Sequence, residues 1–207
     1  MGMIINALRG MHVLVPRNMT KAAGFYNSLL ASDDPALLIE CLNGYRLKEK
    51  LPANLSKIRT PIGISEITKE GEDITLVTYG STWRVVMEAA KQLADIGINA
   101  EVIDVQSLLP FDLNNTILNS IKKTNKVAFI DEDVPGGATA YMMQQVLEKQ
   151  SAYNFLDSKP ISISSKAHRP AYGDDGDYFS KPNVEDIFDI IYKLIHEYNP
   201  KRFSNLY

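Results

Sequence analysis

Short β-rich runs alternate with helix-period stretches from residue 72 almost to the end of the chain. Residues 74–79 are β-branched or apolar almost throughout, and Gly80-Ser81-Thr82 then supplies a turn and candidate helix N-caps. In residues 85–96 the apolar positions recur at three- and four-residue spacing, and Gly97 lies where a left-handed C-terminal residue is needed. This repeated strand-helix unit predicts an α/β fold.

Further units of the same kind follow the first one. The pattern predicts strands at residues 100–105, 127–130 and 161–163, and helices after Asp112, up to about residue 149 and at residues 184–195. Strands joined by helices pair in parallel with right-handed crossovers. Residues 61–197 are therefore expected to form one doubly wound, mostly parallel sheet of four or five strands.

The first 60 residues have a different pattern. Strand-like runs at residues 12–15 and 37–40 flank one predicted helix at residues 19–30, which is too little to close a sheet. We therefore expect residues 1–47 to be a piece of a larger domain and residues 48–60, with Pro52 and little periodicity, to be a linker. Residues 198–207 are expected to be a polar tail.

Composition excludes several classes of protein. The 207 residues carry 22 Lys and Arg against 25 Asp and Glu, and no basic stripe that would neutralise a phosphate backbone, so no nucleic-acid partner is expected. No apolar run approaches the length of a membrane span, and so no membrane partner is expected. One cysteine and no secretory leader pattern make the cytoplasm the expected compartment.

Few residues suggest chemistry by their type and spacing. His12, His168 and His196 are too scattered for a metal site, and Cys41 has no second cysteine beside it, which favours an inert, buried thiol. Gly136-Gly137 opens a helix after a strand, which is only a weak anion-site signal. The residues alone therefore predict no catalytic, cofactor-binding or metal-binding side chain.

Two acidic clusters have competing interpretations. Asp174, Asp175 and Asp177 could supply oxygen ligands to a cation, but their spacing does not match a calcium loop and favours a solvated turn. Residues 131–133 (Asp-Glu-Asp) follow a predicted parallel strand, at the edge where open α/β sheets bind ligands. Structural capping and interface contacts are favoured there over catalysis.

Several segments resemble the β-type subunit of the decarboxylating first component of 2-oxo acid dehydrogenase complexes, a thiamine diphosphate enzyme. They match, in order, the family's Val-Pro-Ser, Asp-Pro-Val-Ile-Phe-Leu-Glu, Ile-Pro-Leu-Gly, Thr-Tyr-Gly, Glu-Val-Ile-Asp-Leu and Val-Asp-Glu segments. The matching residues here are 15–18, 33–40, 61–63, 73–80, 101–112 and 130–132.

This resemblance implies a C-terminal domain of the transketolase type over residues 61–197, preceded by the end of a pyrimidine-binding domain in residues 1–47. It also implies thiamine diphosphate and Mg²⁺ in the complete enzyme, which decarboxylates pyruvate or a branched-chain 2-oxo acid and transfers the acyl group to lipoyl. The family's cofactor glutamate and catalytic histidine lie upstream of the matching segments. This chain alone is therefore expected to bind no cofactor and to be inactive, and Gln106 replaces the arginine usual in the family.

Partners also follow from the resemblance. It implies an α-type half of the enzyme, in some members fused to the β-type half, and a homodimer formed through the C-terminal domain. Phe155-Leu156-Asp157 resembles the family's Phe-Leu-Asp segment, which makes Asp157 a candidate contact for the basic peripheral subunit-binding domain of the dihydrolipoyl acyltransferase. A solvated loop aspartate is an equally good interpretation of Asp157.

Two alternative functions remain open from the sequence. The same C-terminal domain occurs in transketolase and deoxyxylulose-phosphate synthase, although the crevice loops carry few of the basic residues that a sugar phosphate would need. A stand-alone, non-catalytic interaction module is the second alternative.

Overall fold

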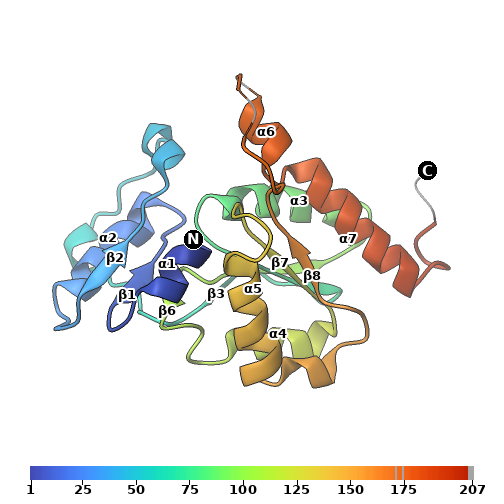
Figure 1. The fold of residues 1–207 in the computed structure, drawn as a ribbon, viewed down its shortest axis with the longest axis horizontal. Helices are drawn as coiled ribbons and strands as arrows, with labels where there is room; N and C mark the ends of the chain where they lie inside the picture. Colours follow the sequence, from blue (N-terminus) through green and yellow to red (C-terminus); the bar gives the residue numbers. More distant parts are fainter. Residues whose placement is uncertain (171, 174, 205–207) are drawn as a thin grey trace.

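The computed structural model describes residues 1–170, 172–173 and 175–204, which form a larger lobe and a smaller N-terminal lobe (Figure 1). The helices are α1 (Gly2–Ala7), α2 (Met19–Leu29), α3 (Thr82–Asp95), α4 (Thr116–Thr124), α5 (Ala138–Met143), α6 (Gly176–Ser180) and α7 (Val184–Tyr198). The strands are β1 (His12–Leu14), β2 (Ala36–Leu38), β3 (Glu66–Lys69), β4 (Ile74–Thr78), β5 (Ala100–Asp104), β6 (Ser107–Leu109), β7 (Val127–Ile130) and β8 (Ile161–Ile163).

The larger sheet has the order β3-β5-β4-β7-β8 and confirms the predicted α/β architecture. Strands β5, β4, β7 and β8 pair in parallel, and only the edge strand β3 runs antiparallel to its neighbour. Every residue of β4, β5 and β7 is buried, because helices cover both faces of the sheet.

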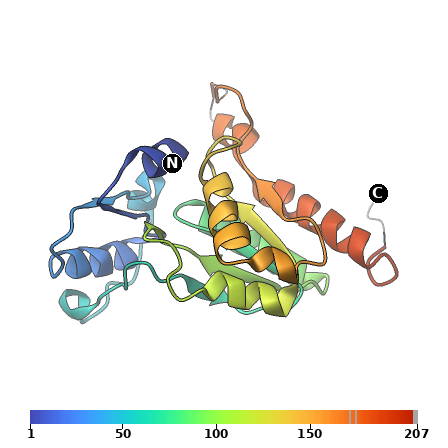
Figure 2. The same ribbon diagram turned by 60° about the horizontal axis from the view of Figure 1, so that its bottom comes forward.

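Helices α3 and α7 cover one face of this sheet, and α4 and α5 cover the other (Figure 2). Successive side chains of β4 point to opposite faces of the sheet. Leu76 packs against α3 and α7, and Val77 packs against α4 and α5. The helix predicted to run to about residue 149 begins as α5 and continues as a π-helical segment, Gln144–Lys149.

The N-terminal lobe is built on a three-stranded sheet of order β2-β1-β6. Its third strand, β6, comes from the part of the chain that also forms the larger lobe, and pairs antiparallel with β1. The sequence pattern did not reveal β3, β6 or α1, since runs of three to six residues are too short for a hydrophobic period to be recognised.

Several local signals have the structural role that the sequence indicated. Gly97 has a φ of 84° beyond the end of α3. The Asp112 carboxylate accepts hydrogen bonds from the backbone N–H groups of Thr116 (3.1 Å) and Ile117 (3.0 Å), and so caps α4 from outside the helix. After α7, Phe203 is buried against Tyr192. No helix among the described residues is long and apolar enough to cross a bilayer.

Candidate functional site

A pocket of about 610 Å³ lies where β4 and β7 end, between the larger lobe and the N-terminal lobe. Tyr79 follows β4 and Asp131 follows β7, and the parallel register of the two strands brings these positions to the same sheet edge. Residues Val15, Ile39 and Leu42 supply an apolar wall from the N-terminal lobe. The pocket therefore has the location at which open α/β sheets bind ligands.

Asp131 is the most deeply buried carboxylate in this pocket, with 1% of its surface exposed. Burial raises its pKa to about 6, although the Tyr79 hydroxyl and the Asp133 amide nearby favour the charged form. Neither carboxylate oxygen of Asp131 accepts a hydrogen bond of normal geometry from the described residues, and the buried Tyr79 hydroxyl is also without such a partner. Burial and the Asp131 charge raise the pKa of Tyr79 far above its ordinary value.

The two carboxylates that follow Asp131 already have partners. Glu132 accepts a hydrogen bond from the Ser81 hydroxyl (3.0 Å) and pairs with Lys181 (3.1 Å). Asp133 accepts from the backbone N–H of Gly2 (2.6 Å) and from the amino group of Met1 (2.8 Å). Burial opposes the charge of Asp133, but these donors hold its pKa below the ordinary value.

The opposite wall carries Glu40 and Cys41. Glu40 accepts hydrogen bonds from the hydroxyls of Tyr26 (2.8 Å) and Tyr45, which ties β2 to α2 and to the Leu42–Arg46 turn. Burial raises the pKa of the Cys41 thiol, which lies 3.5 Å from the carbonyl oxygen of Pro16. Cys41 is thus a protonated thiol that is only half-buried, less than the buried thiol that the sequence indicated.

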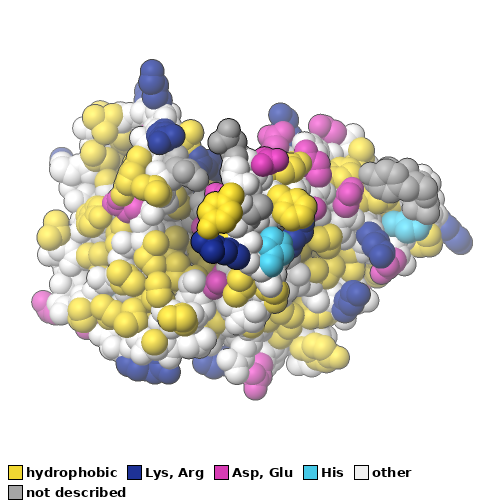
Figure 3. Space-filling model, turned by 45° about the horizontal axis from the view of Figure 1, so that its top comes forward, with side chains coloured by type: hydrophobic (Ala, Val, Ile, Leu, Met, Phe, Trp, Pro, Cys, Tyr) yellow, Lys and Arg dark blue, Asp and Glu magenta, His cyan; other side chains and the backbone are white. Residues whose placement is uncertain are grey.

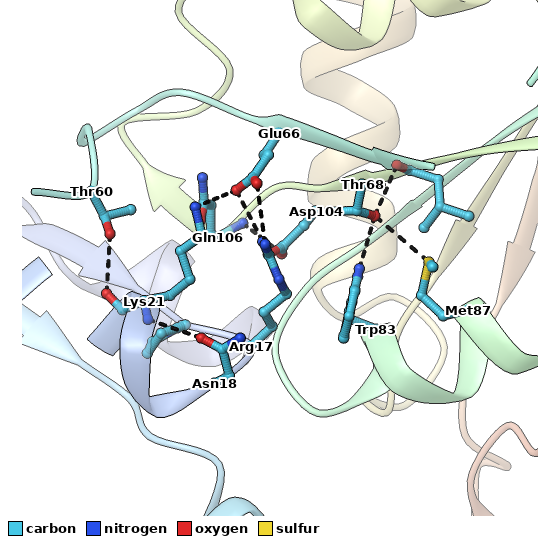
Figure 4. Close-up of polar contacts among 12 residues, drawn as sticks. Arg17, Asn18, Lys21, Thr60, Glu66, Thr68, Trp83, Met87, Asp104 and Gln106 are labelled. Carbon is cyan, nitrogen blue, oxygen red and sulfur yellow. Dashed lines mark hydrogen bonds and ion pairs between the residues drawn. The ribbon is translucent and has the colours of Figure 1, made fainter. Parts of the chain in front are cut away.

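A second polar cluster joins the two lobes (Figure 4). Arg17, just after β1, donates two 3.1 Å hydrogen bonds to Glu66 of β3 and one 2.6 Å bond to Asp104 of β5. Lys21 of α2 also pairs with Glu66. Asp104 has no exposed surface, and burial raises its pKa to about 6 against the opposing effect of Arg17.

The Arg17 guanidinium also lies over the Trp83 ring, 5.0 Å from its centroid. The indole N–H of Trp83 donates a 2.9 Å hydrogen bond to the Thr68 hydroxyl, so the stacking ring is itself held by β3. Gln106, where the family usually has arginine, donates from its side chain to the Ile64 carbonyl oxygen (3.1 Å). Through these contacts the cluster connects the two lobes.

The residues singled out in the sequence are not gathered at one place. Asp157 lies on an exposed loop at the far side of the larger lobe, where it accepts a 3.3 Å hydrogen bond from the Tyr198 hydroxyl. His12, His168 and His196 are each on different segments, near Asp34, Arg169 and Phe203 respectively. Asp174 lies outside the described residues, while Asp177 and residues 131–133 line the pocket.

Two functional candidates escaped the sequence analysis. Tyr79 belonged to a strand pattern, and Arg17 belonged to a loop, so neither had a chemical signature of its own. The signal for Tyr79 was its place one residue beyond a fully buried parallel strand, the same signal that drew attention to Asp131.

The donor set of the pocket does not suit a diphosphate with its Mg²⁺. Five carboxylates line it, those of Glu40, Asp131, Glu132, Asp133 and Asp177, and among its described lining residues only Lys181 has a basic side chain. These carboxylates would repel a diphosphate. Among the described residues no three His, Cys, Asp or Glu side chains are grouped as a metal site. The described residues that line this pocket therefore do not fit a diphosphate with its Mg²⁺.

The chain is similar to subunits of known enzymes. It is 32% identical over 167 residues to the acetoin:2,6-dichlorophenolindophenol oxidoreductase subunit beta of Bacillus subtilis, covering 81% of this chain and 47% of that one. It is 33% identical to the pyruvate dehydrogenase E1 component subunit beta of Acholeplasma laidlawii, over 78% of this chain and 48% of that one. The chain thus spans about half the length of these curated relatives.

Solved structures share the fold. A split-gene transketolase, described as an inactive beta4 tetramer, superposes with a TM-score of 0.70 at 21% identity, covering 93% of this chain and 60% of that one. The family model for the transketolase C-terminal domain matches residues 63–184, which include the larger sheet from β3 to β8. The chain belongs to the transketolase C-terminal domain family.

Proposed function

We propose that this chain is the C-terminal part of the β-type subunit of a thiamine diphosphate-dependent 2-oxo acid dehydrogenase. Similarity to E1 beta subunits over about four fifths of the chain is the observation that carries this proposal. The complete enzyme would decarboxylate pyruvate or a branched-chain 2-oxo acid and pass the acyl group to lipoyl. Within it, this chain would serve subunit assembly and docking to the acyltransferase core.

Thiamine diphosphate and Mg²⁺ would be held elsewhere in the complete enzyme. The acidic pocket supports this assignment, because its carboxylates disfavour a diphosphate. The isolated chain would accordingly bind no cofactor and would not turn over a 2-oxo acid. Residues 1–47 would be the end of a pyrimidine-binding domain, residues 48–60 a linker, residues 61–197 the transketolase-type domain and residues 198–207 a polar tail.

Asp157 would contact the basic peripheral subunit-binding domain of the dihydrolipoyl acyltransferase. Its exposure supports this role, and its backbone N–H donates a 2.9 Å hydrogen bond to the Asn125 carbonyl oxygen, which fixes the loop. A carboxylate presented on a fixed loop loses little conformational entropy when it pairs with a basic partner.

The other partners would be an α-type half of the enzyme and a second copy of this chain. Exposed apolar side chains on the N-terminal lobe support a large protein interface, among them Leu42, Leu47 and Leu51 with 49–76% of their surface exposed. The expected compartment is the cytoplasm, which suits a chain with one unpaired thiol.

Calorimetric titration tests both parts of the proposal on the purified chain. A peripheral subunit-binding domain should bind with a defined stoichiometry, and thiamine diphosphate with Mg²⁺ should give no binding heat. Asp157→Asn should weaken the docking by about tenfold, whereas Asp34→Asn on the N-terminal lobe should leave it unchanged. Tight binding of thiamine diphosphate would contradict the proposal that this chain holds no cofactor. Docking with equal affinity in Asp157→Asn would contradict the proposed contact of Asp157.

A stand-alone interaction module is the remaining alternative of a different class. It is separated from our proposal by affinity purification of the tagged chain from its source cells. Recovery of an acyltransferase core and an α-type subunit supports the dehydrogenase component, and their absence supports the module.

A further inference from the structure

The pocket at the ends of β4 and β7 contains a buried carboxylate, that of Asp131, to which no described residue donates a hydrogen bond of normal geometry. We propose that it binds an organic cation, a primary ammonium or guanidinium group on a short apolar stem, whose charge pairs with Asp131. This inference does not depend on the activity of the complete enzyme, since it rests on the residues of this pocket alone.

The carboxylate of Asp131 is the first observation. Both of its oxygens are buried at the pocket wall, where the Tyr79 hydroxyl and the Asp133 amide lie nearby but no described residue donates a hydrogen bond of normal geometry to them. Buried polar groups in native proteins nearly always have partners, because an unsatisfied one costs about 1–3 kcal/mol and a charged one more. A buried carboxylate whose neighbouring donors are poorly aligned can accept a further hydrogen bond from a group that enters the pocket.

The charge of the pocket selects the kind of donor. Five carboxylates of described residues line the pocket, and the one basic side chain among those residues, that of Lys181, is already paired with Glu132 and Asp177. The Met1 amino group is likewise paired with Asp133, at 2.8 Å. Two neighbouring carboxylates on this wall thus pair directly with ammonium groups, whereas Asp131 forms no ion pair with a described residue.

The size and lining of the pocket favour an organic cation over a bare metal ion. Its volume of about 610 Å³ is far larger than an ion needs, and no described group of three ligating side chains converges in it. The apolar residues Val15, Ile39 and Leu42 line the side that faces the N-terminal lobe, where they can bury an alkyl stem.

Figure 3 looks onto this end of the molecule, where charged side chains of both signs gather around the protruding segment near α6. Hydrophobic side chains cover much of the N-terminal lobe beside it. Within the pocket itself, the apolar side chains of Val15, Ile39 and Leu42 lie opposite the carboxylate of Asp131, which is the combination that an amphipathic cation requires.

The test uses the purified full chain and four small probes at constant ionic strength: n-butylguanidinium, n-butylammonium, n-butanol and butyrate. Amide NMR shifts of Gly80, Ser81 and Glu132 report binding. The two cations should give saturable shifts at these residues, whereas butanol and butyrate should not. Equal shifts with butyrate, or no saturable shift with either cation, overturn the proposal.

Two variants test the residues that carry the proposal. Asp131→Asn keeps the shape of the side chain and should weaken cation binding by about tenfold or more, because a charge-assisted hydrogen bond is lost. Tyr79→Phe should weaken it by a smaller factor. Asp189→Asn on the exposed face of α7 makes the same change in net charge and should leave affinity unchanged. Unchanged affinity in Asp131→Asn contradicts the proposal.

A second arm identifies the source of the cation. The same titration with a blocked Gly-Arg-Gly peptide is compared with free n-butylguanidinium. Tighter binding of the peptide, still dependent on Asp131, assigns the pocket to a side chain of a partner protein. Tighter binding of the free cation assigns it to a small molecule. Peptide binding that is unchanged in Asp131→Asn contradicts the proposal that this pocket binds the cation.

Discussion

Two buried carboxylates show how hydrogen-bond and ion-pair partners decide whether a residue stabilises or destabilises the fold. Asp104 and Asp131 have 0% and 1% of their surface exposed, and burial raises the pKa of each to about 6. Asp104 has the Arg17 guanidinium at 2.6 Å, whereas Asp131 has no hydrogen-bond donor of normal geometry among the described residues. The first stabilises the junction of the lobes, and the second is held at a cost to stability.

Arg17→Met should destabilise the protein by about 3–5 kcal/mol, because it leaves the buried Asp104 carboxylate without its cationic partner. Urea unfolding measures this loss. Arg59→Met, at an exposed position, serves as the control. The double variant Arg17→Met/Asp104→Asn should recover part of the loss. Equal losses of unfolding free energy in the single and double variants would show that the unpaired Asp104 carboxylate does not cause the destabilisation.

Asp131→Asn should stabilise the protein, and the gain should depend on pH. The folded pKa of about 6 exceeds the ordinary 3.8, so the stability of the parent chain is highest with Asp131 protonated and declines as pH rises from about 4 to 6. Asparagine does not titrate, so the unfolding free energy of Asp131→Asn should exceed that of the parent chain by a margin that grows with pH, to at most about 3 kcal/mol above pH 6.

Urea unfolding of Asp131→Asn and the parent chain at pH 4.0 and pH 7.5 measures this difference. Asp189→Asn provides the matched charge control, with no change expected in its pH dependence. A difference between Asp131→Asn and the parent that is the same at both pH values would mean that the pKa of Asp131 is not raised.

At the scale of elements, α2 holds the segment that connects the two regions. The Thr60 N–H donates a 3.1 Å hydrogen bond to the Gly24 carbonyl oxygen, and Ser28 donates a 2.7 Å bond to the Thr60 carbonyl oxygen. The Asn27 side chain donates to the carbonyl oxygens of Leu55 and Ile58. Residues 55–60, which have little periodicity, are therefore ordered by the helix beside them.

Gly24→Ala should weaken this packing even though alanine favours helices. A Cβ at position 24 would lie 2.2 Å from the Thr60 hydroxyl oxygen and 3.0 Å from the Thr60 backbone nitrogen. We expect a loss of about 1–3 kcal/mol and faster amide hydrogen exchange at residues 55–60. Adding Thr60→Gly removes part of the clash, so the two changes should cost less together than their sum. Strict additivity would argue against the clash.

At the scale of the whole molecule, one hydrophobic core contains residues of both lobes. Strand β6 pairs with β1, and one hydrophobic cluster contains Ile5, Val13 and Val15 together with Val77 and Ile103 of the larger sheet. The N-terminal lobe therefore covers apolar surface of the larger lobe, in addition to the Arg17 ion pairs.

Deletion of residues 1–60 should consequently expose apolar surface on the larger lobe. The remaining fragment should unfold at a lower urea concentration than the full chain and should bind a hydrophobic dye, since β6 loses its partner and the shared cluster loses one side. A fragment with the midpoint of the full chain and no dye binding would show that the lobes are independent.

The sequence by itself determined the α/β class and most of the elements, because periods of 3.6 and 2 residues follow directly from which side chains face a core. The apolar spacing in α3 and α7 and the buried runs of β4, β5 and β7 carried that information. The resemblance to E1 beta subunits also rested on local segments, and it agrees with the curated relatives.

Only the tertiary structure decided how these elements meet. The three- or four-residue strands β3 and β6 form because neighbouring strands offer hydrogen-bond partners, and not because of their own pattern. Arg17 and Asp104 are 87 positions apart in the chain, and Tyr79 meets Asp131 only through the register of β4 with β7. Long-range pairing and burial set the charge states of Asp104, Asp131 and Tyr79. Neither can be predicted from a local stretch of sequence.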